Sequence, residues 1–389
     1  MRNLLIKHAD LYTPDHVGLR DILILNGAVA HIDCEIDVCS LPNLEVLDAC
    51  GRKVIPGYID QHVHIIGGGG ESGPFSRTPE VPLSEVTCAG VTTLVGVIGT
   101  DGTTRHPESL LAKARALTTE GISAYVLTGS YELPLHTITG DARKDIVVIN
   151  EVLGIGEIAI SDHRSSQPTK DELKRVLTQA RLGGMLSGKA GVVQFHMGSG
   201  KTGLSMLMEI IDETEIPAKH FIPTHINRDP ALFEQGKEFA RKGGYIDITS
   251  GVREKEGFSG CIKPSEAIRI CAEEGVPMDR LTMSSDGNGC MSEVQPDGTV
   301  RQLVAKLYSL HEEICDAVKD GVPMEIASRV CTENPAKANG LWPKKGCLSV
   351  GSDADLLILD EEMKIDTVIA MGQKMVQGGR ALVKGTFEE

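Results

Sequence analysis

Two histidines separated by one residue, His62 and His64, stand at the end of the apolar run 54–59. Side chains alternate between the faces of a β-strand, so residues two apart point the same way. Two imidazoles on one face at a strand's end can bind one metal ion side by side. The same pair can also be hydrogen-bonded within a core, and the pair alone leaves that alternative open.

Histidines and carboxylates recur in other apolar segments of the chain. The candidate ligands are His62, His64, Glu157, His196, His225 and Asp286. Each one alone is weak support, because a buried histidine is more often structural than a ligand. Five segments that place a ligand-type residue at the same end favour a site for two divalent ions that share a bridging carboxylate, with open positions for water.

Hydrolysis is the chemistry that such a site does best. Two metal ions lower the pKa of a bridging water and polarise the carbonyl group under attack. A neighbouring carboxylate can take the proton of that water and deliver it to a leaving amine. Asp286 is the candidate, because it follows an apolar segment within a Gly/Ser turn. Its alternative role is to cap that turn.

Apolar segments alternate with amphipathic, helix-like stretches through the middle of the chain. The apolar segments are 54–65, 92–99, 123–128, 156–160, 192–196, 221–225, 245–249 and 281–285, and the clearest helical stretches are 107–120, 170–182, 230–241 and 264–274. Eight such alternations predict an α/β fold, a (β/α)₈ TIM-like barrel whose active-site face lies at the C-terminal strand ends. The alternative is an open doubly wound sheet, which would need a glycine-rich dinucleotide turn after its first strand.

The two ends of the chain have a different pattern of short β-type pieces and turns. Residues 1–53 and 340–389 are expected to pair into one small β-sandwich domain. The barrel would then comprise residues 54–339.

Composition excludes some classes of partner. Of 389 residues, 54 are acidic and 39 are basic, which gives a formal net charge of −15. This balance argues against general binding to nucleic acid or to anionic membranes. No apolar run approaches the roughly 18 residues of a membrane span. The ten cysteines are scattered, which is typical of reduced thiols, and the start of the chain lacks the apolar core of a signal peptide. We therefore expect a cytoplasmic protein.

At these residues the sequence resembles the isoaspartyl dipeptidases (β-aspartyl peptidases) of the amidohydrolase superfamily. The segments that carry the resemblance are 56–64, 67–71, 99–101, 105–111, 159–165, 195–198, 223–225, 246–250 and 284–289. The four-glycine loop that ends in Glu71 and the Ser-Asp-His-Arg segment 161–164 are the most specific. The resemblance implies a barrel with two zinc ions that cleaves dipeptides joined through the β-carboxyl of an N-terminal aspartate, by attack of a metal-bridged hydroxide. It also implies a homo-oligomer, an octamer.

The resemblance also implies roles for individual residues. The more buried zinc would be held by His62, His64 and Asp286, and the other by His196 and His225. Tyr131 would help to polarise the scissile carbonyl, and Asp286 would act as general base and acid.

Two positions depart from the family's pattern. Its best-known members bridge the two zinc ions with a carboxylated lysine, where this chain has Glu157. We predict that Glu157 bridges the ions directly. Cys290 stands where a substrate-contacting serine is expected, and a thiol is a weaker hydrogen-bond donor.

The predicted substrate has two free carboxylates and one α-amino group. Arg164 and Arg228 are candidates for the carboxylates, because arginine binds them bidentately. Alternatively, these arginines are tied in surface ion pairs to the neighbouring aspartates. Glu71 is the candidate for the ammonium group, and glycines such as Gly69 let backbone N–H groups approach a carboxylate. Thr100 and Cys290 complete the predicted contacts.

Two rival functions remain open. Another amidohydrolase activity, on cyclic amides or N-acyl amino acids, would keep the metals without requiring Glu71, Arg164 and Arg228. A non-catalytic binding relative would be expected to have lost metal ligands, whereas all six candidate ligands are present.

Overall fold

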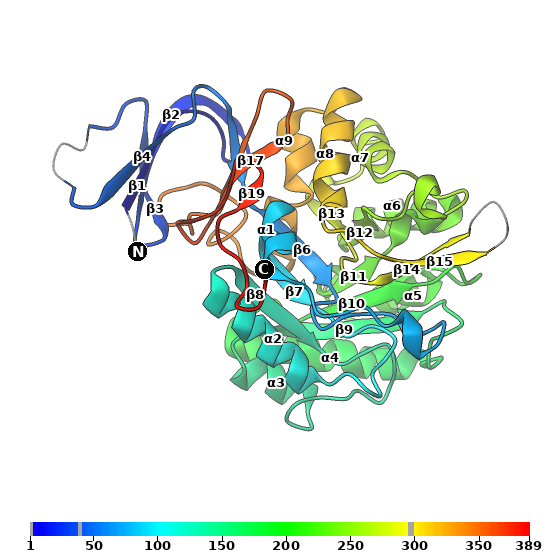
Figure 1. Cartoon of the computed structure of the whole chain (residues 1–389). Helices are drawn as coiled ribbons and strands as arrows, with labels where there is room; N and C mark the ends of the chain where they lie inside the picture. The colour runs from blue at the N-terminus through cyan, green and yellow to red at the C-terminus, as the bar shows by residue number, and fades with distance from the viewer. Residues whose placement is uncertain (1–2, 38–40, 295–298) are drawn as a thin grey trace.

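The structure is a computed structural model that describes residues 3–37, 41–294 and 299–389. Figure 1 shows a barrel surrounded by helices and, beside it, a sheet in which strands from the N-terminus and the C-terminus meet. The sheet from the chain ends lies on one side of the barrel. The family-like segments of the sequence lie almost entirely within the barrel.

Eight parallel strands form the barrel in the described part of the chain. They are β6 (Tyr58–Val63), β7 (Val91–Gly96), β8 (Ser123–Thr128), β9 (Val152–Ile160), β10 (Val192–Met197), β11 (Phe221–Thr224), β12 (Ile246–Thr249) and β13 (Leu281–Ser284). Strands β6 to β11 pair in sequence order, and β12 pairs with β13. Hydrogen bonds from Tyr245 N to Phe221 O (3.3 Å) and from His64 N to Gly287 O (2.9 Å) join the two sheets on both sides. The predicted (β/α)₈ barrel is confirmed.

Helices cover the outside of the barrel, and sequence signals explain where several begin. They are α1 (Leu83–Cys88), α2 (Pro107–Glu120), α3 (Ala142–Val148), α4 (Lys170–Ser187), α5 (Ser205–Glu213), α6 (Pro230–Arg241), α7 (Pro264–Glu273), α8 (Ser309–Lys319), α9 (Met324–Arg329) and α10 (Glu333–Ala338). The Asp229 side chain accepts a hydrogen bond from Leu232 N at 2.9 Å and caps α6, as its Asp-Pro start predicts. Within the described ranges, no helix is long and apolar enough to cross a membrane.

Helix α4 continues past its predicted end at residue 182 and reaches Ser187. Gly183 and Gly184 resemble a helix end in sequence, but here they permit close packing. A Cβ on Gly184 would lie 2.8 Å from the Cα of Gly191. The helix instead ends at Gly188, whose φ of 71° is left-handed.

The first predicted segment, 54–65, is in fact two strands that belong to different sheets. Strand β5 (Lys53–Pro56) pairs with strands from both chain ends, whereas β6 lies in the barrel. Gly57 separates them, and a Cβ there would lie 2.3 Å from Thr92 Oγ1. Both strands are buried, so the apolar pattern runs across the break without marking it.

Strands from both ends join in one nine-stranded sheet of the described chain. Its members are β1 (Asn3–Tyr12), β2 (His16–Leu25), β3 (Ala28–Asp33), β4 (Leu44–Asp48), β5, β16 (Leu356–Leu359), β17 (Ile365–Ala370), β18 (Gln373–Gln377) and β19 (Arg380–Ala381). One apolar cluster contains Ile6 and Ile24 from the N-terminal strands and Ile358 and Ile369 from the C-terminal strands. This is the small β region expected from the two chain ends.

A hairpin that the sequence did not predict follows β13. Its strands, β14 (Cys290–Val294) and β15 (Val300–Val304), pair antiparallel. Figure 1 shows the hairpin projecting from the barrel. It begins at Cys290, so it positions one of the predicted substrate contacts.

Candidate active site

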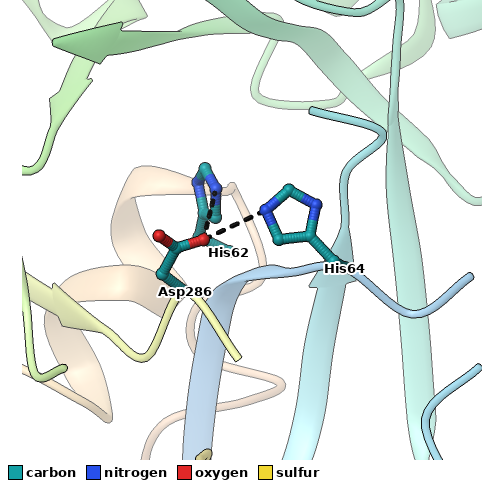
Figure 2. A group of neighbouring side chains, drawn as sticks. All are labelled: His62, His64 and Asp286. Carbon is teal, nitrogen blue, oxygen red and sulfur yellow. Dashed lines mark hydrogen bonds and ion pairs between the residues drawn. The ribbon is translucent and has the colours of Figure 1, made fainter. Parts of the chain in front are cut away.

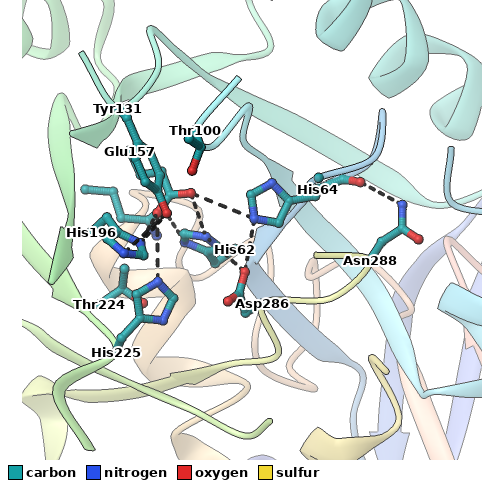
Figure 3. A network of polar contacts seen from close by, with 12 residues as sticks. His62, His64, Thr100, Tyr131, Glu157, His196, Thr224, His225, Asp286 and Asn288 are labelled. Carbon is teal, nitrogen blue, oxygen red and sulfur yellow. Dashed lines mark hydrogen bonds and ion pairs between the residues drawn. The ribbon is translucent and has the colours of Figure 1, made fainter. Parts of the chain in front are cut away.

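The six predicted metal ligands lie together at the C-terminal ends of the barrel strands. Figure 3 shows them pointing toward one another. They come from β6 and the residue after it (His62, His64), from β9 (Glu157), from β10 (His196) and from the turns after β11 (His225) and β13 (Asp286). All are buried except Asp286, whose side chain is 29% exposed. The barrel therefore places the ligand-type residues at one point, as the strand-end pattern predicted.

One half of the cluster is formed by His62, His64 and Asp286, shown in Figure 2. Asp286 Oδ1 lies 3.0 Å from His64 Nε2 and 3.6 Å from His62 Nε2. Glu157 Oε1 lies 3.2 Å from His62 Nε2 and 3.8 Å from His64 Nε2. Ligand atoms around a tetrahedral zinc ion are about 3.4 Å apart, because each bond is about 2.0–2.1 Å. The spacing fits one divalent ion.

The other half faces the second carboxylate oxygen of Glu157. Glu157 Oε2 lies 3.2 Å from His196 Nδ1 and 3.9 Å from His225 Nε2. The two oxygens of one carboxylate thus face different pairs of histidines. This is the arrangement that a bridging carboxylate between two ions requires.

Several ligand atoms are buried without a hydrogen-bond partner among the described residues: His62 Nε2, Glu157 Oε1 and His225 Nε2. Leaving such an atom unpaired costs about 1–3 kcal/mol. The other ring nitrogens are engaged, since His62 Nδ1 lies 2.9 Å from Gln194 Oε1 and His225 Nδ1 lies 2.7 Å from Thr249 Oγ1. Such bonds orient imidazoles that bind metals. The residues present therefore fit divalent metal ions.

The electrostatics of the cluster favour positive charge. Burial opposes ionisation of Glu157, but the neighbouring histidines hold the pKa of its carboxyl group well below the usual value. Burial also opposes a charge on His62, yet the Glu157 carboxylate raises the pKa of that imidazole to about 10. Burial lowers the pKa of His225 to about 3, so this ring is neutral and can offer a lone pair to a metal.

Left-handed backbone conformations orient two of the candidate ligands. His225 and Asp286 have left-handed φ angles of 64° and 54° at the points where β11 and β13 end. Such conformations cost about 1–3 kcal/mol and are typical of functional sites. Asp60 links β6 to the turn after β13, because it accepts a hydrogen bond from Ser285 N at 3.1 Å. Within β6 it also accepts a hydrogen bond from His62 N at 3.3 Å.

A cavity of about 460 Å³ opens above the ligand cluster. It is lined by every predicted substrate contact and by Tyr131: Gly69, Glu71, Thr100, Tyr131, Arg164, Arg228 and Cys290. Glu71 and Thr100 follow β6 and β7, and the two arginines follow β9 and β11. Residues that are far apart in the chain thus form one wall around the cluster.

The two arginines differ in their pairing. The Nε atom of Arg228 is buried without a hydrogen-bond partner among the described residues, and burial lowers the pKa of its guanidinium. The neighbouring Asp229 caps α6. Arg164, in contrast, is paired with Asp162 through Nε (3.0 Å) and Nη2 (2.8 Å), as the alternative interpretation held. Its Nη1 also lies 3.4 Å from Glu71 Oε1.

Tyr131 and Cys290 both line the cavity. The hydroxyl of Tyr131 lies 2.7 Å from His196 Nδ1, and burial raises the phenol's pKa well above 10, so it is protonated and can donate. The Cys290 thiol donates to Gln302 Oε1 at 2.9 Å, across the β14–β15 hairpin.

Comparison with known proteins identifies the family. Residues 53–375 match the amidohydrolase family. The chain belongs to that family. β-Aspartyl dipeptidase from Fervidobacterium islandicum AW-1, solved in complex with β-Asp-Leu dipeptide, is 41% identical with a TM-score of 0.88, over 97% of this chain and 98% of that one. A second structure of that enzyme gives 42% identity and a TM-score of 0.89 over the same shares.

A curated relative in the family is the L-hydantoinase of Paenarthrobacter aurescens. It is 24% identical over 413 residues, which cover 96% of this chain and 88% of that protein. The resemblance to the β-aspartyl dipeptidases is therefore confirmed. The identity to those enzymes, 41%, is well above the 24% identity to the hydantoinase. This amidohydrolase is a hydrolytic enzyme with close structural neighbours among β-aspartyl dipeptidases.

Sequence reasoning missed several residues of this amidohydrolase site. The cavity is also lined by Ser199, Gly257, Phe258, Ser259, Gly289 and Met291. They lie in loops or in the unpredicted hairpin and carry no charge, so residue type alone does not single them out. Gln194 had a usable signal, because it lies two residues before His196 and shares its face of β10.

Proposed function

We propose that the protein is a zinc-dependent isoaspartyl dipeptidase that hydrolyses the isopeptide bond of β-aspartyl dipeptides. The observation that carries the proposal is the position of Glu157. Its two oxygens face separate groups of histidines, beside a cavity lined by the carboxylates of Glu71 and Asp286 and by two guanidinium groups. The 41% identical neighbour, solved with β-Asp-Leu, supports the choice of substrate.

Two zinc ions fit the donor set. His62, His64 and Asp286 with Glu157 Oε1 would hold one ion, and His196 and His225 with Glu157 Oε2 the other. Imidazole and carboxylate are ligands that zinc prefers. When bound, the ions would lower the pKa of a water molecule and polarise the scissile carbonyl. A glutamate provides the bidentate carboxylate of a carboxylated lysine without needing bicarbonate.

Asp286 and Tyr131 would carry the proton chemistry. Burial opposes ionisation of Asp286, but the surrounding histidines lower its pKa, so it is a carboxylate at neutral pH. It would accept the proton of the attacking water and deliver it to the leaving amine. The protonated Tyr131 would donate a hydrogen bond to the carbonyl oxygen as negative charge develops there.

The cavity wall would recognise the charged groups of the dipeptide. Arg228, buried without a partner of its own among the described residues, would bind one carboxylate. Arg164 would bind the other, and Glu71 would bind the α-ammonium group. Gly69, Thr100 and Cys290 would supply the remaining polar contacts. A cyclic amide such as a hydantoin lacks these free charges and would leave the same groups unpaired.

Release of aspartate tests the proposal. The zinc-loaded protein is incubated with β-Asp-Leu, with its α-linked isomer and with a hydantoin. We expect cleavage of β-Asp-Leu alone. Cleavage of the hydantoin but not of β-Asp-Leu would replace the proposal with a cyclic amidase. Equal cleavage of both aspartyl isomers would contradict the recognition scheme.

A further inference from the structure

Arg105 is a buried cation that the proposed reaction does not use. It lies between β7 and α2, and only 4% of its surface is exposed. Its guanidinium donates to backbone carbonyls of the glycine-rich loop after His64: Nη2 to Gly68 O at 2.7 Å, Nη1 to Gly69 O at 3.2 Å and Nε to Ile66 O at 3.5 Å. Asp101 holds the guanidinium in place, with Oδ2 3.2 Å from Nη1.

The loop that Arg105 binds borders two cavities. Gly69, Glu71 and Thr100 line the substrate cavity of about 460 Å³ and also a second cavity of about 670 Å³. A Cβ on Gly70 would have its nearest neighbour, Arg77 Cγ, at 3.8 Å. Gly70 therefore has room around it, whereas Gly69 is closely packed, since a Cβ there would lie 2.2 Å from Ser76 O and 2.6 Å from Cys290 Cβ. Hydrogen bonds to the loop carbonyls add to this packing and orient the peptide groups.

The hydrogen bonds of Arg105, together with those of Thr78, set the direction of one peptide group. In a planar trans peptide, the C=O and the N–H point in opposite directions. Gly68 O points to Arg105, and Thr78 N donates to the same oxygen at 3.0 Å. The N–H of Gly69 therefore points away from Arg105, and Gly69 is the residue of this peptide that lines the substrate cavity.

We propose that Arg105 is a positioning residue for substrate binding. By holding the carbonyls of Gly68 and Gly69, it presents the Gly69 N–H to the cavity and fixes Glu71 two residues further along. This inference rests on the proposed function, in which Glu71 binds the ammonium group of the dipeptide. Arg105 itself is not among the residues that line the substrate cavity.

The geometry requires arginine rather than any cation. A planar guanidinium reaches several acceptors in a fixed fork, whereas a lysine ammonium is a single point charge on a flexible stem. Arg105→Lys is therefore expected to keep the charge but to lose some of the hydrogen bonds to the loop carbonyls. Arg105→Gln loses both.

Steady-state kinetics on β-Asp-Leu tests the role. Arg105→Gln is expected to raise KM about tenfold or more with a smaller change in kcat, because binding groups move while the groups that react do not. Arg105→Lys is expected to lie between this variant and the wild type. Arg115→Gln is the matched control, since it removes a paired arginine from the exposed face of the adjoining helix α2. A fall in kcat with an unchanged KM would overturn the proposal.

Two further measurements separate positioning from a merely structural role. If Arg105 acts through the loop, Arg105→Gln costs less in a Glu71→Gln background than in the wild type. Full additivity would contradict this. Hydrogen exchange of residues 68–72 should accelerate in Arg105→Gln while that of β8 stays unchanged. Unchanged exchange in residues 68–72 would show that Arg105 does not hold the loop.

The exchange measurement needs no turnover. If the wild-type protein fails to cleave β-Asp-Leu, the proposed function is wrong. Hydrogen exchange still tests whether Arg105 holds the loop. If Arg105→Gln does not fold, Arg105→Lys supports the same comparisons.

Discussion

Two clusters of buried charged groups lie at opposite ends of the barrel strands. At the N-terminal end, Lys345 is 3% exposed, and its Nζ lies 2.6 Å from Ser123 Oγ, 2.6 Å from Asp355 Oδ2 and 2.8 Å from Asp353 Oδ2. At the C-terminal end, His62 Nε2 and Glu157 Oε1 lie 3.2 Å apart, but neither atom forms a well-directed hydrogen bond among the described residues. Both clusters are buried and charged, but only one is complete.

This contrast separates buried charges that stabilise the fold from those that are placed to bind a metal ion. Lys345 and its partners satisfy one another and join the barrel to the sheet from the chain ends. The ligand cluster is incomplete by itself, and its atoms without hydrogen-bond partners converge within 4.8 Å of one another, as the ligands of a metal ion do. Both clusters are buried, and they differ in whether their polar atoms are all paired.

The largest expected effect lies at the incomplete cluster. Asp286→Asn should lower kcat on β-Asp-Leu about 1000-fold, because an amide cannot take the proton of the attacking water. Steady-state assays of aspartate release measure the effect, with the exposed Asp171→Asn on α4 as the control. Activity within tenfold of the wild type would assign the proton transfer to another group.

Glu157→Gln should lower the amount of metal that the ligand cluster binds. The variant loses one of two equivalent oxygens and the negative charge, so it should hold fewer than two ions per chain after dialysis and lose at least about 100-fold in activity. Elemental analysis measures the metal content. Glu151→Gln, in the same part of the chain and paired with Arg115, is the control. Two retained ions in Glu157→Gln would contradict the bridging role.

Lys345→Met breaks the complete cluster and should affect stability alone. It leaves Asp353 and Asp355 without their cation, which costs about 3 kcal/mol of unfolding free energy, as measured by denaturant titration. Burial opposes the charge on Lys345, but the two aspartates raise its pKa above 10.5. Its contribution is therefore fully present below pH 10.5 and is lost as the pH rises through the raised pKa. A loss of bound metal in this variant would show that the two clusters are coupled.

Arg228→Gln tests the unpaired guanidinium in the cavity wall. We expect kcat/KM for β-Asp-Leu to fall about 100-fold, mainly through KM, because a charged hydrogen bond to a substrate carboxylate is lost. Arg241→Gln, near the end of α6, removes an arginine away from the cavity and serves as the control. An unchanged KM in Arg228→Gln would remove this residue from substrate binding.

Thr249→Val is expected to have the smallest effect. It removes the hydroxyl that lies 2.7 Å from His225 Nδ1, so the imidazole is oriented less well and metal affinity falls about tenfold. Competition with a chelator measures the affinity. Thr249→Ser keeps the hydroxyl and should bind metal as the wild type does, whereas equal losses in both variants would point to packing instead.

Strand periodicity predicted the barrel and the part of the site that strands carry. His62, His196 and His225 were found because each stands at or near the end of an apolar segment, and the barrel brings such ends together. Residue type and position were enough there. The break at Gly57 was missed, because its cause is the close approach of Thr92, which local sequence does not contain.

Loops were predicted least well, because contacts distant in sequence determine their shape. The hydrogen bond from Arg105 to the carbonyl of Gly69 joins residues about 36 apart in the chain. Phe258 and Met291 reach the cavity only through a loop and a hairpin that have no periodic pattern. The roles of Glu71 and Arg164 came mostly from the family resemblance, since charge alone left surface pairing equally open.

A crystal structure of the zinc-loaded protein, with anomalous scattering collected at the zinc edge, would show directly whether Glu157 bridges two metal ions. We predict two peaks about 3.5–4 Å apart, one beside His62 and His64 and the other beside His196 and His225, with one oxygen of Glu157 on each. A single peak, or two peaks that Glu157 does not join, would contradict the direct glutamate bridge.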